Sequence, residues 1–161
     1  MHEVLVWLEG SALGHAMRNS GVWTYGLVNL THILGIASFF GAILLLDLRL
    51  LGLWRHVPIA AIAGPAVPVA ASGLAVSFAS GLCLITTNAT EYSGNPFLLV
   101  KFPAIAVGLL NAAVVQRLPG WRAREARALT MQESNQLRVA AGVSLVAWLT
   151  AIAAGRLTAY W

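Results

Sequence analysis

A single histidine, His32, lies inside the long apolar run NLTHILGIASFFGAILLLDLRLLG, residues 29–52. Tyr25 and Asn29 precede it at spacings of four and three residues, so in a helix the three polar side chains share one face. Gly35 continues that face and leaves space beside the imidazole. Because ionisable side chains are costly inside a bilayer, His32 is the first candidate functional residue.

The residue type allows three interpretations of His32. It can be a structural histidine, hydrogen-bonded to Asn29, to a backbone carbonyl or to another helix. It can be a metal ligand, above all an axial ligand of haem b, or it can contact a proton path or a quinone. His32 is the one histidine in an expected span, so a second axial ligand would have to be His15, from the N-terminal segment. A five-coordinate haem, or none, fits equally well.

Two cations, Lys101 and Arg156, are expected in the outer parts of their helices. Both could point into an outward-facing vestibule above His32. Two cations above one imidazole favour an anionic or acceptor group, such as haem propionates, a quinone carbonyl or an anionic lipid headgroup. The alternative is that both side chains snorkel to the membrane interface.

Three further polar residues are predicted to have structural roles. Asp47 and Arg49 end the first apolar run and are two residues apart, so each is expected to pair with another helix or with loop charges rather than with the other. Asn111 lies deeper than Lys101, near the same side of its helix. No Ser/His/Asp motif, glycine-rich phosphate loop or zinc-type cluster accompanies them. The sequence therefore favours a protein that is not an enzyme by itself, and whether it catalyses a reaction stays open.

The composition defines what must position these residues. The chain of 161 residues is 58% hydrophobic and 10% charged. Soluble globular proteins average about 45–50% apolar and about 25% charged residues, so an integral membrane protein is predicted. The expected fold is all-α: a membrane four-helix bundle forming a single domain over residues 1–161.

Four stretches are long enough to cross about 30 Å of hydrocarbon. They lie near residues 22–46, 65–87, 96–116 and 139–160. Residues 1–19 are instead expected to form a short amphipathic helix at the interface.

Local signals mark the ends of these helices. Ser20 is expected to cap the first span, and Pro65 and Pro68 are expected in the first turn of the second. Thr130 and Glu133 have the spacing of a capping box, so the fourth helix is expected to begin before the membrane.

The basic residues predict an orientation. Seven arginines fall in or beside two connecting segments: Arg49, Arg55, Arg117, Arg122, Arg124, Arg127 and Arg138. This pattern is typical of cytoplasmic loops rather than of a nucleic-acid surface, so no nucleic-acid partner is expected. We therefore predict a multi-pass protein of the bacterial inner membrane, in contact with lipid and with both termini on the periplasmic side.

The segment HILGIASFFGAILLLDLRLLG (32–52) resembles the first span of a family of small, largely uncharacterised bacterial proteins with four transmembrane helices. Their pattern is His-x-x-Gly followed by Asp-Leu-Arg-Leu-Leu-Gly. LEG (8–10) and FLLVKFPAIAVGLLNA (97–112) are similar too. More distantly, the chain is similar to copper-resistance protein D-like and b-type cytochrome-like bundles. The resemblance implies that the family-type positions are His32, Asp47, Arg49, Lys101 and Asn111.

The leading functional expectation is a redox-associated protein with an outer-side pocket around His32. The pocket would hold haem b or a quinone-type ligand for electron transfer, with Lys101 and Arg156 on its anionic part. The alternative is an accessory subunit that binds a larger membrane complex, or a homo-oligomer, through stripes of small residues. A third, weaker interpretation is copper binding or transport near Met1, His2, His15 and Met17.

Overall fold

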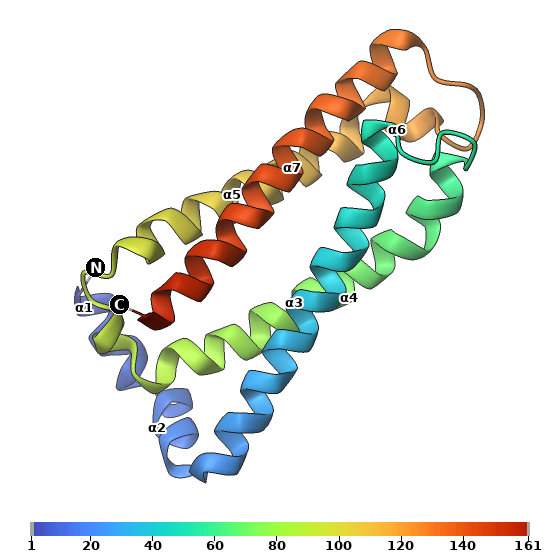
Figure 1. Ribbon diagram of the computed structural model, residues 1–161. Helices are drawn as coiled ribbons and strands as arrows, with labels where there is room; N and C mark the ends of the chain where they lie inside the picture. The colour runs from blue at the N-terminus through green and yellow to red at the C-terminus, as the bar shows by residue number, and fades with distance from the viewer. Residues whose placement is uncertain (1, 161) are drawn as a thin grey trace. The chain divides into compact units, whose positions relative to one another are not determined.

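The computed structural model describes residues 2–160, and this part of the chain consists of helices and short connections (Figure 1). The elements, in order, are α1 (His2–Glu9), α2 (Ala12–Asn19), α3 (Gly21–Leu51), α4 (Ile59–Thr87), the 3-10 turn η1 (Ala89–Tyr92), α5 (Pro96–Arg117), α6 (Pro119–Ala123), α7 (Met131–Leu157) and the 3-10 turn η2 (Thr158–Tyr160). The prediction of an all-α helical bundle is confirmed.

Four of these helices, α3, α4, α5 and α7, are long and apolar enough to cross a membrane. At 1.5 Å per residue, even the shortest of them reaches the length of about 30 Å that the hydrocarbon layer requires. Much of their apolar surface is not covered by the protein itself, which suits contact with lipid acyl chains.

The N-terminal segment differs from the single amphipathic helix predicted for residues 1–19. It forms two helices, α1 and α2, because Ser11 starts a new one: its hydroxyl accepts a hydrogen bond of 3.1 Å from the Gly14 amide. Ser20 does not cap α3 as expected. Its hydroxyl donates to the Met17 carbonyl at 2.7 Å and so closes α2 instead.

The start of α4 also differs from the prediction. The helix begins at Ile59, so Pro65 and Pro68 lie inside it and not in its first turn. Three of the six residues before Pro65, IAAIAG, are alanine, the best helix former, which favours the earlier start. Prolines are tolerated inside membrane helices because neighbouring groups can satisfy the carbonyls that they free.

The chain divides into two compact units, and α3 and α4 each contribute to both. The first unit holds the residues up to Phe40 together with Val69–Asn95. The second unit holds Gly41–Pro68 and the chain from Pro96 on.

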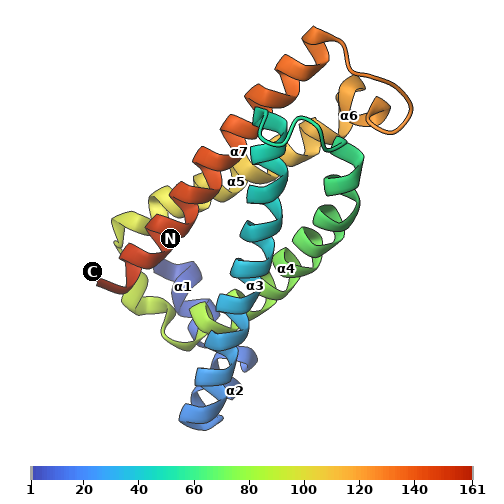
Figure 2. The same ribbon diagram turned by 45° about the vertical axis from the view of Figure 1, so that its right-hand side comes forward.

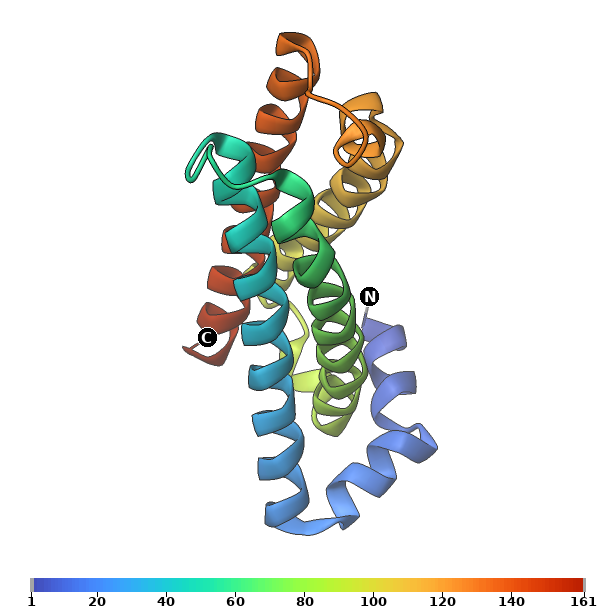
Figure 3. The same cartoon turned by 90° about the vertical axis from the view of Figure 1, so that its right-hand side faces the viewer.

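In the first unit, polar contacts fasten α1 and α2 to the end of α4 and to η1. The Glu9 carboxylate accepts two hydrogen bonds of 2.7 Å, from the amide and the hydroxyl of Thr90. Arg18 donates to the Thr87 carbonyl at 3.0 Å and to the Glu9 carbonyl at 2.8 Å. Figure 3 shows α1 and α2 turning back beside this end of α4.

In the second unit, a buried apolar cluster joins the C-terminal part of α3 and the start of α4 to α6 and α7. Its members are Leu46, Leu50, Ala63, Ala66, Trp121, Leu137 and Ala141. Figure 2 shows the short helix α6 and the connection that leads from it to α7. The predicted capping box at Thr130 and Glu133 is confirmed and begins α7. We call this end, with the connections at 52–58 and 118–130, the arginine-rich end.

Candidate functional site

His32 ties α3 to α4 inside the first unit. Its Nδ1 lies 2.8 Å from the Ser77 carbonyl oxygen and 3.1 Å from the Ser80 hydroxyl oxygen. A carbonyl can only accept a hydrogen bond, so Nδ1 carries the proton that is donated to Ser77. In the neutral ring this leaves the lone pair on Nε2. This contact matches the structural interpretation of His32, a hydrogen bond to a carbonyl of another helix. The contact does not itself exclude a metal ligand or a contact with a proton path or quinone.

Glycines allow the close approach of α3 and α4 around this histidine. A Cβ atom at Gly35 would lie 2.8 Å from the Ser77 backbone nitrogen, and one at Gly73 would lie 2.6 Å from the Phe39 backbone nitrogen. A Cβ at Gly81 would lie 2.9 Å from Cε1 of the His32 ring. The space next to the imidazole that the sequence assigned to Gly35 is therefore provided by Gly81, on the partner helix.

The other predicted neighbours of His32 lie at the surface of the first unit. Tyr25 and Asn29 are exposed on α3. His15 is exposed on α2, where its Nδ1 lies 3.4 Å from Nη2 of Arg18. Burial, followed by the charges of Tyr25 and Glu91, raises the pKa of Tyr92 in the η1 turn.

Lys101 and Arg156 belong to the second unit. The Lys101 side chain packs on Gly155 of α7, where an added Cβ would lie 3.4 Å from Nζ. Arg156 is exposed, donates a hydrogen bond of 2.6 Å to the Tyr160 hydroxyl and stacks over that ring at 4.9 Å. The vestibule that these two cations were expected to share with His32 stays a prediction, because His32 belongs to the first unit.

The three residues expected to have structural roles all lie in the second unit. Asp47 is buried and accepts a hydrogen bond from the Ser144 hydroxyl of α7, while its Oδ2 has no partner among the described residues. Arg49 donates to the Val57 and Arg55 carbonyls, at 2.6 Å and 3.2 Å. Asp47 and Arg49 were each expected to pair with another helix or with loop charges. Asp47 contacts another helix, but the expectation needs correction for Arg49. Its partners are loop carbonyls, because the chain turns back over the guanidinium.

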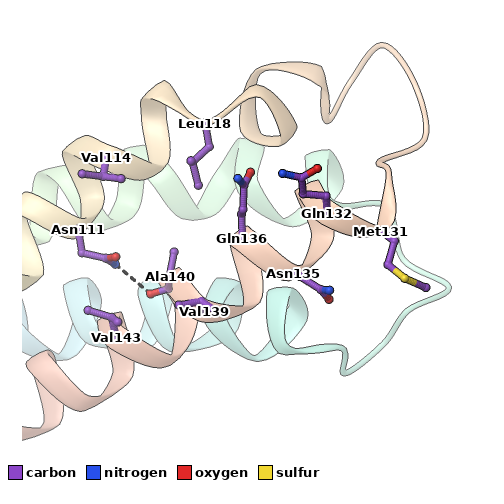
Figure 4. A pocket seen from close by; sticks show the side chains of 10 residues that line it. All are labelled: Asn111, Val114, Leu118, Met131, Gln132, Asn135, Gln136, Val139, Ala140 and Val143. Carbon is purple, nitrogen blue, oxygen red and sulfur yellow. Dashed lines mark hydrogen bonds between the residues drawn. The ribbon is translucent and has the colours of Figure 1, made fainter.

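Asn111 lies beside a groove of about 780 Å³ between α5 and α7 (Figure 4). Its amide nitrogen donates a hydrogen bond of 3.0 Å to the Ala140 carbonyl. Apolar side chains from both helices form much of the wall, and amides cluster towards the start of α7. The lining residues are Asn111, Val114, Leu118, Met131, Gln132, Asn135, Gln136, Val139, Ala140 and Val143. None of them carries a charge.

Sequence reasoning missed this groove, although a signal for it was present. Gln132, Gln136, Val139 and Val143 recur at spacings of three and four residues, which places them on one face of α7. Figure 4 shows Gln132 and Gln136 pointing from α7 towards α5, near Leu118. The volume of the groove, its apolar walls and its few polar groups fit a small-molecule site.

Within the described part of the chain, no group of three or more His, Cys, Asp and Glu side chains could hold a metal ion. Of the residues considered for copper, His15 is exposed and Met17 is buried, whereas Met1 lies outside the described residues. The copper interpretation therefore gains no support from this part of the chain.

The fold and the groove define a class: an all-α protein whose four long apolar helices fit a multi-pass membrane protein, with an uncharged groove on one helix pair. The chain belongs to the family of unknown function DUF6644, whose model matches residues 4–161. No curated protein and no solved structure matches the chain. The expected likeness to copper-resistance protein D-like and b-type cytochrome-like bundles stays a prediction.

Proposed function

We propose that the protein binds a lipid-soluble, quinone-type ligand in the groove between α5 and α7. The observation that carries this proposal is the combination of apolar walls with an uncharged cluster of amides at one end. A quinone has a matching arrangement of apolar and polar parts, because it joins an apolar tail to a neutral headgroup with two carbonyl acceptors.

The lining explains how such a ligand would be held. Valine side chains of both helices, with Leu118 just after α5, provide a surface for the tail, and both helices can span a membrane. Gln132 and Gln136 supply N–H donors for the headgroup carbonyls, at the arginine-rich end where α7 begins. Both amides are exposed in the structure, and a headgroup bound over them would take them out of water. A ligand with carbonyl oxygens is then favoured over one without them, since an amide donor that is covered without an acceptor is costly.

Headgroup recognition can be tested with decylubiquinone and with decylbenzene, which has a similar tail and a ring without carbonyls. We expect the purified protein in detergent to bind decylubiquinone more tightly. The Gln132→Leu and Gln136→Leu double variant should lose about tenfold in quinone affinity and little in decylbenzene affinity. Gln116→Leu is the matched control, because Gln116 lies on α5 and does not line the groove. Equal affinities for both compounds would overturn the proposal.

A second candidate, haem b bound at His32, is favoured by one specific contact. Histidines that bind a metal commonly donate their other ring N–H to a carbonyl, and Nδ1 of His32 does so to Ser77. The fit is incomplete, because no other histidine lies in the four long apolar helices. Addition of haem to the purified protein tests this candidate: a Soret band that His32→Ala removes would support it, and an unshifted spectrum of free haem would exclude it.

A further inference from the structure

A second cavity, of about 260 Å³, lies at the arginine-rich end of the second unit. Three arginines line it: Arg49 from the end of α3, Arg55 from the connection to α4, and Arg138 from α7. Ser134 adds a hydroxyl to the same lining. No acidic residue lines this cavity, so its walls combine three positive charges with neutral groups.

The positive charge of this cavity is not balanced by carboxylates nearby. The ion pairs found among the described residues join Arg124 to Glu125 and Arg127 to Glu133. Both carboxylate oxygens of Glu133 accept hydrogen bonds from Arg127, and neither residue lines the cavity. Like charges brought together in one cavity repel one another, and an anion would relieve that repulsion.

Backbone contacts hold two of the guanidinium groups in place. Arg49 donates through Nε to the Val57 carbonyl at 2.6 Å, and Arg55 donates through Nε to the Gly52 carbonyl at 3.2 Å. Gly52 has a φ of 115°, and a Cβ there would lie 3.0 Å from the Arg55 guanidinium. The glycine therefore lets Arg55 fold back over the chain.

Most guanidinium donors remain available after these contacts. A guanidinium has five N–H donors; Arg55 and Arg138 each use one in the hydrogen bonds found here, and Arg49 uses two. Planar forks of N–H donors match the oxygens of a phosphate group, which they bind in pairs. Fixed positions lower the entropy that is lost when such a group binds.

We propose that this cavity binds a phosphate group. Two sources share that chemistry: the phosphodiester of an anionic phospholipid and a free inorganic phosphate. The cavity lies where α3 ends and α4 begins, and leucine and isoleucine side chains line it beside the arginines. Basic pockets between membrane helices are known to hold lipid headgroups.

The test measures the unfolding temperature of the purified protein in detergent during titration with phosphatidylglycerol, phosphatidylcholine or inorganic phosphate. Stabilisation by phosphatidylglycerol alone assigns a lipid headgroup, and stabilisation by inorganic phosphate as well assigns a site for the free ion. In either case, the double variant Arg55→Gln with Arg138→Gln should lower the affinity for the stabilising anion about tenfold. Arg49 is left unchanged, because its contacts with the Val57 and Arg55 carbonyls shape the connection.

Arg117→Gln with Arg122→Gln is the matched control, since it also removes two positive charges near the same end, from exposed arginines that do not line the cavity. It should change the affinity less than twofold. The proposal is overturned if neither anion stabilises the protein more than phosphatidylcholine does. It is also overturned if the control loses as much affinity as the double variant, because the effect would then be one of net charge. Far-UV circular dichroism of each variant verifies that it is folded.

Discussion

The side-chain amide of Asn111 donates a hydrogen bond of 3.0 Å to the backbone carbonyl of Ala140, and so joins α5 to α7 beside the groove. Hydrogen bonds between membrane helices contribute about 0.6 kcal/mol on average and up to about 1.7 kcal/mol. Asn111→Leu should therefore lower the free energy of unfolding by an amount within that range. Unfolding in mixed micelles measures it, with Gln116→Leu as the control on the same helix. A variant more stable than the natural chain would show that this contact does not help to hold the helix pair.

The glycines between α3 and α4 give a sharper prediction. Gly35→Ala should destabilise the protein by about 1–3 kcal/mol, because the added Cβ would meet the Ser77 backbone, which cannot rotate away. Gly26→Ala lies on the same helix, has no atoms within 4 Å of an added Cβ, and should be neutral or slightly stabilising. Equal effects of the two substitutions would contradict the close helix approach at Gly35.

The contact between Glu9 and Thr90 predicts a pH dependence in the N-terminal segment. Hydrogen bonds from the Thr90 hydroxyl and amide lower the pKa of Glu9 below its ordinary value of 4.5. The contact therefore stabilises the fold above that pH and is lost as the pH falls through the lowered pKa. The amide signal of Thr90, followed by NMR in micelles, should titrate with a midpoint below 4.5.

Two variants identify the group that titrates. Glu9→Gln should abolish the transition at Thr90, whereas Glu3→Gln, which changes an exposed carboxylate of α1, should leave it unaltered. A midpoint at or above 4.5 would contradict the hydrogen-bond geometry at Glu9.

The buried Asp47 predicts a difference between two substitutions. Asp47→Ala leaves the Ser144 hydroxyl without its acceptor and opens a cavity, so we expect a loss of about 2–4 kcal/mol. Asp47→Asn keeps the shape and an acceptor oxygen and should stay within about 1 kcal/mol of the natural chain. Denaturation in micelles compares the two, and an equal loss in both would mean that the charge itself is required.

The sequence predicted those parts of the fold that depend on local patterns. Apolar length identified the four long helices, and the spacing of Thr130 and Glu133 identified the capping box of α7. The break at Ser11 was missed because the apolar spacing continues across it, while the hydroxyl hydrogen bond decides where α2 begins.

The candidate sites were harder to predict, because they depend on which helices meet. His32 was recognised as a polar residue at membrane depth, but its partner Ser77 offers a backbone carbonyl, which no side-chain pattern reveals. Likewise, the arginines of the second cavity are far apart in the sequence and come together only through the fold. The accessory-subunit interpretation, the inner-membrane location and the sides of the termini remain predictions.

Photolabelling shows directly whether a quinone-type ligand binds between α5 and α7. A quinone with an azide on its headgroup is activated by light in the presence of the purified protein, and the labelled peptides are identified by mass spectrometry. Because Gln132 and Gln136 would hold the headgroup, we expect labelling within residues 114–118 and 131–136, with competition by excess decylubiquinone. Labelling confined to the surroundings of His32, or spread without competition over all four long helices, would contradict it.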